Sequence, residues 1–377
     1  MLSLRALKRS ILPIILSPIL FGSTFSFASE DFSSVYNAYL EAFKQEDYTT
    51  ALSLSQQALE LGGKQFKENT DNYLNLRFNY ANMLQQTKQH KEAYAEYQAV
   101  EEAFAKRDGE DAASVFPVRI ERYYVATILA RDDSDFAKAK RNIIKDLIRQ
   151  VEELSAQQPD KSAFYHYGLV SILQRSNTAF STLRKTIGFA EQAVEIMEQS
   201  FGATDQRLVE SQFYLAKLYK NAKRLDAAAQ QYEAIVEVLD DNLNYSHPWA
   251  LTAHANLVDI FERKGESDKA TAHCVAIGRM TPWDENILEP KPIFRTNPKY
   301  PVNYARAGRE GFAKIEFDID EYGFVINPRI MEVQGGNSFG DASVEALKQW
   351  RYAPKFINGE AQVANNRYVQ MDFYIRR

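Results

Sequence analysis

Small and apolar residues recur at helical spacing through most of the chain and then alternate with polar residues near its C-terminal end. Four segments share one pattern, an alanine followed four and seven positions later by further small or apolar residues, at Ala51, Ala93, Ala228 and Ala270. Such positions share one face of a helix. Ala51 and Ala93 are 42 residues apart, as are Ala228 and Ala270, and a fixed period of this size predicts stacked helical hairpins.

A second helix is expected before each of these alanines, because small and aromatic residues occupy packing positions there, as in Tyr80-Ala81-x2-Leu84. Two fainter pairs are expected over residues 116–154 and 164–201. The sequence therefore predicts an α-helical solenoid of five or six hairpins over residues 29–281.

The hairpins resemble tetratricopeptide repeats of the longer, kinesin-light-chain type, in which a His-Pro such as His247-Pro248 often opens the first helix. The resemblance implies a concave groove that binds a peptide or protein, and a spacer role is the alternative. Most tyrosines near the first helices are expected to pack between helices, and the others to line the groove: Tyr36, Tyr39, Tyr73, Tyr123, Tyr124, Tyr165 and Tyr167.

Prolines cluster after the helical region, where five of the chain's 12 lie between Pro282 and Pro301. Proline removes a backbone donor and restricts the residue before it, so a helix cannot continue there. Residues 282–296 are therefore predicted to be an extended linker, and 297–377 a second domain.

The second domain is predicted to be a small α+β unit. From Phe312 to Ile319 the apolar residues alternate, a turn follows at Asp320 to Gly323, and a second strand runs from Val325 to Val333. Ser338 with Asp341 predicts the start of a helix that includes Trp350 and stops at Pro354. A final strand begins near Arg367.

The order of these features resembles the C-terminal domain of the TonB family: Asn297-Pro298-Lys299-Tyr300-Pro301, a glycine before a strand, a glycine turn, and Trp350-Arg351-Tyr352-Ala353-Pro354. In that family the domain grips outer-membrane transporters, and a short segment of the transporter adds to the edge of the last strand. The family often has Gln-Pro where this chain has Asn297-Pro298, and the shorter side chain keeps the amide but bears on which transporter is chosen.

The resemblance implies that the protein-binding residues lie before the Tyr-Pro motif, in the Trp-Arg-Tyr motif and along the last strand. They are Asn297, Pro298, Tyr300, Pro301, Arg351, Tyr368, Val369, Gln370, Met371, Asp372, Phe373 and Tyr374.

The amino terminus has the pattern of a secretory signal over residues 1–28. Arg5, Lys8 and Arg9 precede an apolar run from Ile11 to Phe21, and Ser26-Phe27-Ala28 is a cleavage site. This predicts export to the periplasm with cleavage near Ala28. A retained anchor in the inner membrane is the alternative, and through it TonB-family transducers contact proton-channel components, although the His typical of that helix is absent here.

The composition, with 45% hydrophobic and 25% charged residues, is that of a globular protein. A formal charge of −5 argues against a nucleic-acid partner, which requires a basic surface. Cys274 is the only cysteine, so no intramolecular disulfide forms, and it is expected to be a buried apolar residue.

Known catalytic and cofactor-binding patterns are missing from the sequence. The five histidines show no metal-binding spacing, and there is no phosphate loop and no nucleophile elbow. We therefore expect no enzyme, cofactor or metal, and a periplasmic TonB-family protein that binds transporters and a second protein. The alternatives are a membrane-anchored energy transducer, or an envelope scaffold that binds peptidoglycan or proteins unrelated to uptake.

Overall fold

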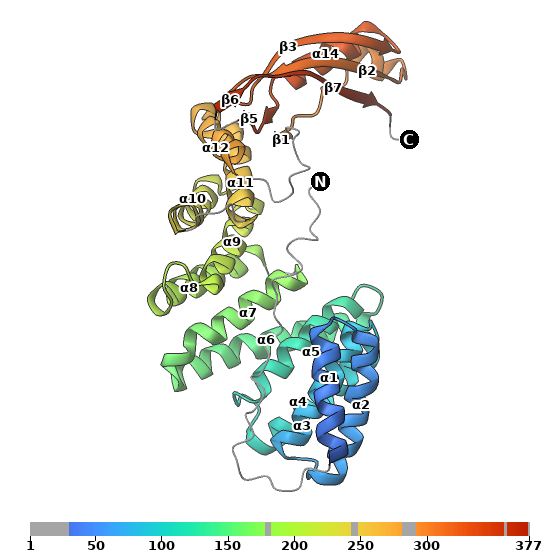
Figure 1. Cartoon of the computed structure of the whole chain (residues 1–377), viewed down its shortest axis with the longest axis vertical. Helices are drawn as coiled ribbons and strands as arrows, with labels where there is room; N and C mark the ends of the chain where they lie inside the picture. Colours follow the sequence, from blue (N-terminus) through green and yellow to red (C-terminus); the bar gives the residue numbers. More distant parts are fainter. Residues whose placement is uncertain (1–29, 178–181, 243–247, 281–291, 358–359, 376–377) are drawn as a thin grey trace. The chain divides into compact units, whose positions relative to one another are not determined.

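The computed structural model describes residues 30–177, 182–242, 248–280, 292–357 and 360–375. The signal segment 1–28 and His247 lie outside these residues. Within them, twelve stacked α-helices of tetratricopeptide-like repeats precede a small domain of mixed α and β structure, as predicted (Figure 1). The chain divides into two compact units, Met1–Ser200 and Phe201–Arg377.

The first unit contains four helical hairpins, each made of two consecutive antiparallel helices. The two faint pairs expected in the middle of the sequence are confirmed as α5/α6 and α7/α8. The helices are α1 (Glu30–Lys44), α2 (Tyr48–Gln65), α3 (Asp71–Gln86), α4 (His90–Asp108), α5 (Val115–Leu129), α6 (Ser134–Gln157), α7 (Ser162–Ser176) and α8 (Leu183–Ser200).

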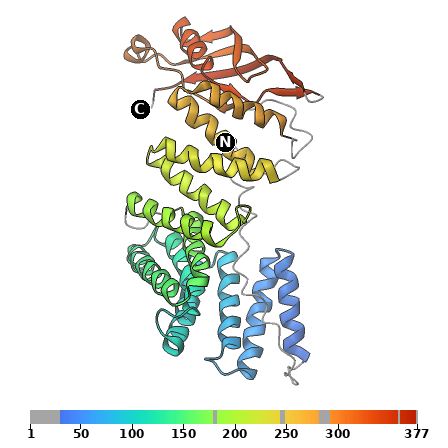
Figure 2. The same cartoon turned by 90° about the vertical axis from the view of Figure 1, so that its left-hand side faces the viewer.

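The second unit begins with two further hairpins, α9 (Gln206–Asn221) with α10 (Leu225–Asn242), and α11 (Pro248–Lys264) with α12 (Ser267–Arg279). Their layers are visible beside the C-terminal strands in Figure 2. The four alanines that define the sequence repeat are completely buried on the second helices of their hairpins: Ala51, Ala93, Ala228 and Ala270. A small side chain at this position lets the two helices of a hairpin approach closely.

The turn between the helices of a hairpin repeats as regularly as the alanines. Glu46, Lys88, Lys223 and Gly265 each have a positive φ and each precede an anchoring alanine by five residues. The next residue donates a backbone hydrogen bond five positions back in all four turns, as Gln89 does to Leu84 at 2.8 Å. This is a left-handed helix stop, in which the positive φ satisfies carbonyls at the end of the first helix.

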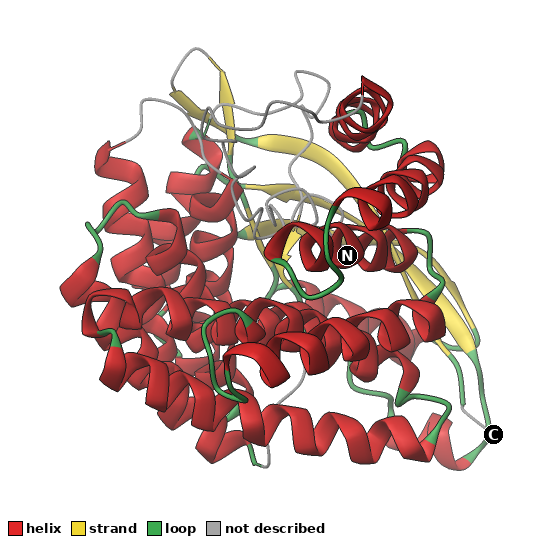
Figure 3. Ribbon diagram, turned by 90° about the horizontal axis from the view of Figure 1, so that it is seen from below, coloured by secondary structure: helices red, strands yellow, loops and turns green. Residues whose placement is uncertain are grey.

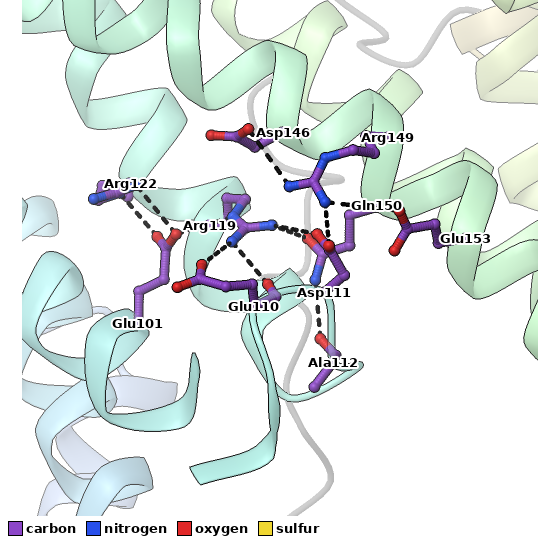
Figure 4. A network of polar contacts seen from close by, with 10 residues as sticks. All are labelled: Glu101, Glu110, Asp111, Ala112, Arg119, Arg122, Asp146, Arg149, Gln150 and Glu153. Carbon is purple, nitrogen blue, oxygen red and sulfur yellow. Dashed lines mark hydrogen bonds and ion pairs between the residues drawn. The ribbon is translucent and has the colours of Figure 1, made fainter. Parts of the chain in front are cut away.

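Buried polar residues join α4, α5 and α6 in the first unit (Figure 4). Arg119, 2% exposed, donates from Nε to Glu101 at 2.9 Å and from Nη1 to Gln150 at 2.9 Å. Arg122 completes the group with an Nε contact of 2.8 Å to Glu101. Burial raises the pKa of Glu101, although both arginines oppose the shift. The network therefore fixes the third hairpin against the second by paired charges as well as by apolar packing.

The C-terminal domain is built on an antiparallel sheet with the strand order β3-β2-β7, and the strands of the described residues are confined to this domain (Figure 3). Helix α14 packs on β2 and β3, and Phe339 of that helix stacks on Phe373 with ring centroids 4.3 Å apart. The elements are β1 (Pro292–Phe294), α13 (Val302–Arg306), β2 (Gly311–Ile319), β3 (Val325–Gln334), α14 (Asn337–Leu347), β4 (Arg351–Tyr352), β5 (Lys355–Ile357), β6 (Glu360–Gln362) and β7 (Ala364–Phe373).

The predicted limits of the helix in this domain were wrong at both ends. It begins after Gly336, whose φ of 138° requires glycine, and no side chain caps it, so Ser338 is not the cap. It ends at Leu347, before Trp350 and well before Pro354. Arg351 and Tyr352 instead form β4, because their backbone pairs with β1.

Residues 292–294 of the expected extended linker form the strand β1, which pairs with β4 and so belongs to the C-terminal domain. Linker residues 282–291 lie outside the described residues. The irregularity expected around Pro328 is confirmed. The β2–β3 register shifts between Ile326 and Arg329, the stretch that contains Pro328, and the preceding Asn327 has a φ of 51°. Proline is tolerated here because β3 is an outer strand of the sheet, where a missing donor leaves no neighbour unpaired.

Candidate protein-binding edge of the C-terminal sheet

Strand β7 forms one edge of the three-stranded sheet. It pairs with β2 from Gly311↔Phe373 to Ile319↔Ala364. Among the described residues, no strand pairs with its other side. The strand is 10 residues long, so it presents a long row of outward backbone donors and acceptors. An extended segment of another chain can pair with such an edge.

The side chains of β7 alternate between the core and the solvent. Met371 and Phe373 are buried, whereas Tyr368 is 67% exposed and Tyr374, just beyond the strand, is 71% exposed. The Tyr368 hydroxyl donates to Glu316 at 2.8 Å, and this hydrogen bond raises the pKa of the tyrosine. Gln370 donates to Asp372 at 2.7 Å on the strand. The core-facing residues thus fix the strand while its polar face remains open.

Both ends of β7 are tied to the body of the domain. Near its start, the buried carboxylate of Asp318 accepts the Asn366 backbone N–H at 2.9 Å and the Asn327 amide at 3.1 Å. These bonds lower the pKa of Asp318. Beyond its end, the Ile375 N–H donates to Glu310 at 2.9 Å. A strand held at both ends keeps its edge preformed for a partner.

The Tyr-Pro motif lies against the same core. The Tyr300 ring packs edge-on against Phe339 and Phe373, with centroids 5.6 and 5.5 Å away, and its hydroxyl donates to the Arg309 carbonyl at 2.5 Å. Pro301 precedes α13. Asn297 is exposed and Pro298 half-buried. Tyr300 therefore supports the edge from inside, while Asn297 faces solvent.

An open cleft of about 360 Å³ lies beside the first half of β7. Its walls come from the segment around β1, from β2, from the Trp-Arg-Tyr motif and from β7: Pro292, Arg295, Phe317, Trp350, Tyr352, Asn366, Arg367, Tyr368 and Val369. The Arg295 guanidinium lies 4.9 Å from the Trp350 ring centroid, and the Trp350 indole donates to the Thr296 carbonyl at 2.9 Å. Sequence reasoning missed Arg295 and Arg367, which flank the recognised motifs and have no periodic signal of their own.

Arg351 is separated from this edge by its burial. The structure places it at 1% exposure against the chain's own helices α11 and α12, where its guanidinium pairs with Glu262. Of the residues predicted to bind another protein, those of the last strand form one continuous edge. Arg351 instead makes contacts within the chain.

A cluster that the histidine spacing did not reveal lies in the helical part of the second unit. His254 Nδ1 is 2.8 Å from His273 Nδ1, and His254 Nε2 is 2.9 Å from the Asp240 carboxylate. The three residues come from three different helices, so no local motif connects them. In the described ranges, no group of three or more His, Cys, Asp or Glu side chains could hold a metal ion.

These features define a small α+β domain with an open sheet edge, and it follows a helical repeat array. Residues 296–375 match the family model described as Gram-negative bacterial TonB protein C-terminal. They form a TonB C-terminal domain, preceded by tetratricopeptide-like repeats that resemble those of kinesin light chains.

The relatives are similar to this chain over short stretches. Protein TonB of Yersinia enterocolitica is 36% identical over 63 residues, which are 17% of this chain and 25% of that protein. Protein TonB of Klebsiella pneumoniae is 27% identical over 92 residues, or 24% of this chain and 38% of that protein. The chain thus spans only about a quarter to two fifths of the length of these relatives.

Solved structures of repeat proteins are similar in fold. A putative kinesin light chain from Podosopora anserina has a TM-score of 0.34 and 14% identity, covering 64% of this chain and 91% of that one. A tetratricopeptide repeat protein from Parabacteroides merdae has a TM-score of 0.42 and 11% identity, covering 67% and 82%. In the part of the chain that the structure describes, no helix combines the length and apolar character needed to cross a bilayer.

Proposed function

We propose that this is a periplasmic protein that binds TonB-dependent outer-membrane transporters through the edge of β7. Its helical repeats bind a second protein, and the whole supports energised uptake across the outer membrane. The TonB match over residues 296–375 supports the transporter as partner. The signal-like segment 1–28 supports export, with cleavage near Ala28.

The observation that carries this proposal is the open edge of β7. A transporter segment of five or six residues adds there as a further strand, and its backbone provides most of the affinity. The cleft beside Tyr368 and Val369 receives one of its side chains. Asn297 and Pro298 contact the transporter body next to the added strand.

The repeats provide the second contact. Tyr39, Tyr123 and Tyr165 are buried, whereas Tyr36, Tyr73, Tyr124 and Tyr167 are partly exposed. The partly exposed tyrosines are amphipathic contacts of the kind that protein interfaces favour, and we assign them to the groove. Arg175 lies 3.9 Å from the Tyr124 ring centroid and pairs with Glu121, so the groove carries charge as well as aromatic surface.

Disulfide trapping in the full-length chain tests the binding edge. Gln370 and Glu332 both lie opposite Lys314, on the two outer strands β7 and β3, and both are exposed. We compare Gln370→Cys with the matched control Glu332→Cys, using peptides from transporter N-terminal segments with one cysteine at successive positions. The native Cys274 is buried and does not compete.

Strand addition at β7 predicts cross-links for Gln370→Cys at alternate peptide positions, because successive side chains of a strand point to opposite faces. It predicts none for Glu332→Cys. Equal trapping at both edges, or at Glu332 alone, would contradict the proposed edge. Absence of saturable binding to peptides from several transporters would contradict the transporter itself.

Two alternatives have their own readouts. The intact mass of the protein in periplasmic and membrane fractions decides between export and a retained anchor. A soluble species beginning at Ser29 supports the proposed periplasmic protein, whereas a membrane species that keeps Arg5 supports a membrane-anchored energy transducer. Sedimentation with purified cell-wall sacculi, without transporter binding, would favour an envelope scaffold.

A further inference from the structure

The Arg351 guanidinium is surrounded by partners from three parts of the second unit. It pairs with Glu262 of α11 at 2.5 Å and donates to Thr271 Oγ1 of α12 at 2.9 Å. It also donates to the Tyr322 carbonyl at 3.2 Å and lies 3.6 Å from the Phe324 ring centroid. A planar guanidinium with several donors is suited to joining separate elements in this way.

The outer face of α12 is shaped to receive the C-terminal domain. A Cβ atom added to Gly278 would lie 2.7 Å from the Pro354 carbonyl oxygen and 2.8 Å from the Phe356 ring. One helical turn earlier, the buried Cys274 has its Cβ 3.6 Å from the position of a Cβ on Gly323. A glycine at 278 therefore allows the close approach of Pro354 and Phe356 to α12.

The contact continues beside Arg351, where Arg279 of α12 places its guanidinium 5.9 Å from the Phe356 ring centroid. Within the hairpin, Ser267 of α12 donates to the second carboxylate oxygen of Glu262 at 2.9 Å and so helps to hold the partner of Arg351 in place. Figures 1 and 2 both show α12 beside the β5–β6 hairpin, and α12 contacts β5 while α11 contacts β1.

A repeat array needs a cap at each end, because each hairpin exposes a face on which the next hairpin would stack. The face of α12 is covered by a domain of a different fold. We propose that the C-terminal domain is the cap of the repeat array, and that Arg351 joins it to the α11–α12 hairpin as one cooperative unit. A partner held at β7 is then held in a fixed position relative to the last repeat.

Hydrogen exchange of the full-length chain tests this coupling, because it reports on each element separately. Arg351→Met removes the charge from the domain side, and Glu262→Gln removes it from the helix side with little change of shape. Arg329→Met is the matched control, since Arg329 is in an ion pair with Glu316 at the sheet surface, 3.3 Å apart and away from α12.

We expect Arg351→Met to lower protection at least tenfold in α11 and α12, and Glu262→Gln to do the same in β4 and β7. Amides of α3 and α4, in the first unit, provide an internal reference that stays unchanged. The double variant should lose no more protection than either single variant alone. Loss confined to the part that carries each substitution, or equal to that of Arg329→Met, would overturn the proposal.

Discussion

Arg351 and Glu262 are 89 positions apart in the sequence, and their side chains meet at 2.5 Å in the interior of the second unit. The arginine belongs to the Trp-Arg-Tyr motif of the C-terminal domain and the glutamate to the last helical hairpin. A motif residue that the resemblance led us to expect at a partner interface is thus engaged within the chain. Through this ion pair, the stability of the α11–α12 hairpin and the stability of the C-terminal domain depend on each other.

Replacing Arg351 by methionine should lower the free energy of unfolding of the second unit by about 3–5 kcal/mol, because it leaves a buried carboxylate without its partner. The three tryptophans of the chain, at 249, 283 and 350, all lie in this unit, so urea unfolding followed by tryptophan fluorescence reports on it alone. The ion pair of Arg329, whose own side chain is 56% exposed, serves as control, and Arg329→Met should cost less than about 1 kcal/mol. Equal costs for the two variants would show that the buried pair has no special role.

Cys274 should be almost unreactive toward thiol reagents in the folded protein. It is buried, and burial raises the pKa of its thiol to about 11, so little thiolate forms at neutral pH. Because the C-terminal domain covers it, Arg351→Met should raise the rate of reaction with an aromatic disulfide reagent at least tenfold. If the reaction rate of Cys274 in Arg351→Met is no higher than in Arg329→Met, the C-terminal domain still shields the thiol without the ion pair.

The left-handed turn residues of the hairpins give a matched pair of substitutions. Lys223 has a φ of 59° and is exposed, so Lys223→Gly should stabilise the protein by about 1 kcal/mol by removing the strain of a Cβ. Gly265 has a φ of 77° in the equivalent turn, and Gly265→Ala should destabilise it by a similar amount. Thermal unfolding of both variants checks this, and shifts of the same sign would contradict it.

The regular parts of the fold could be predicted from the sequence because each depends on residues close together in the chain. Ala93 and Tyr97 lie on one helical face whatever surrounds them, and the alternation from Ala313 to Ile319 defines a strand by itself. The edge of β7 followed from the resemblance and the position of the strand at the end of the domain.

What the sequence could not provide depends on contacts between distant segments. Trp350 continues the helical spacing of α14, but the helix stops at Leu347 because Arg351 and Tyr352 pair with β1. The partner of Arg351 is a glutamate in another domain, and no local pattern points to it. The same is true of Arg295, whose place in the cleft depends on the fold of the segment before the Tyr-Pro motif.

The paired histidines make a pH-dependent prediction for the last hairpins. Burial and the neighbouring His254 lower the pKa of His273 to about 4, although Asp240 opposes the shift. The ring stacks on Phe261 with centroids 5.7 Å apart, so it is held between α11 and α12. A base whose pKa is lower in the folded state binds protons preferentially in the unfolded state. Acidification from about pH 6.5 toward 4 should therefore destabilise the second unit, by at most about 3 kcal/mol.

The measurement is urea unfolding at pH 7.5 and pH 5, a range that leaves most carboxylates ionised. His273→Phe keeps the ring contact with Phe261 and removes the titrating group, so its stability should change less between the two pH values than that of the native chain. Arg329→Met again serves as a control and should keep the native pH dependence. If His273→Phe shows the same loss on acidification as the native chain, the sensitivity comes from other groups, and His273 is only a packing residue between the two helices.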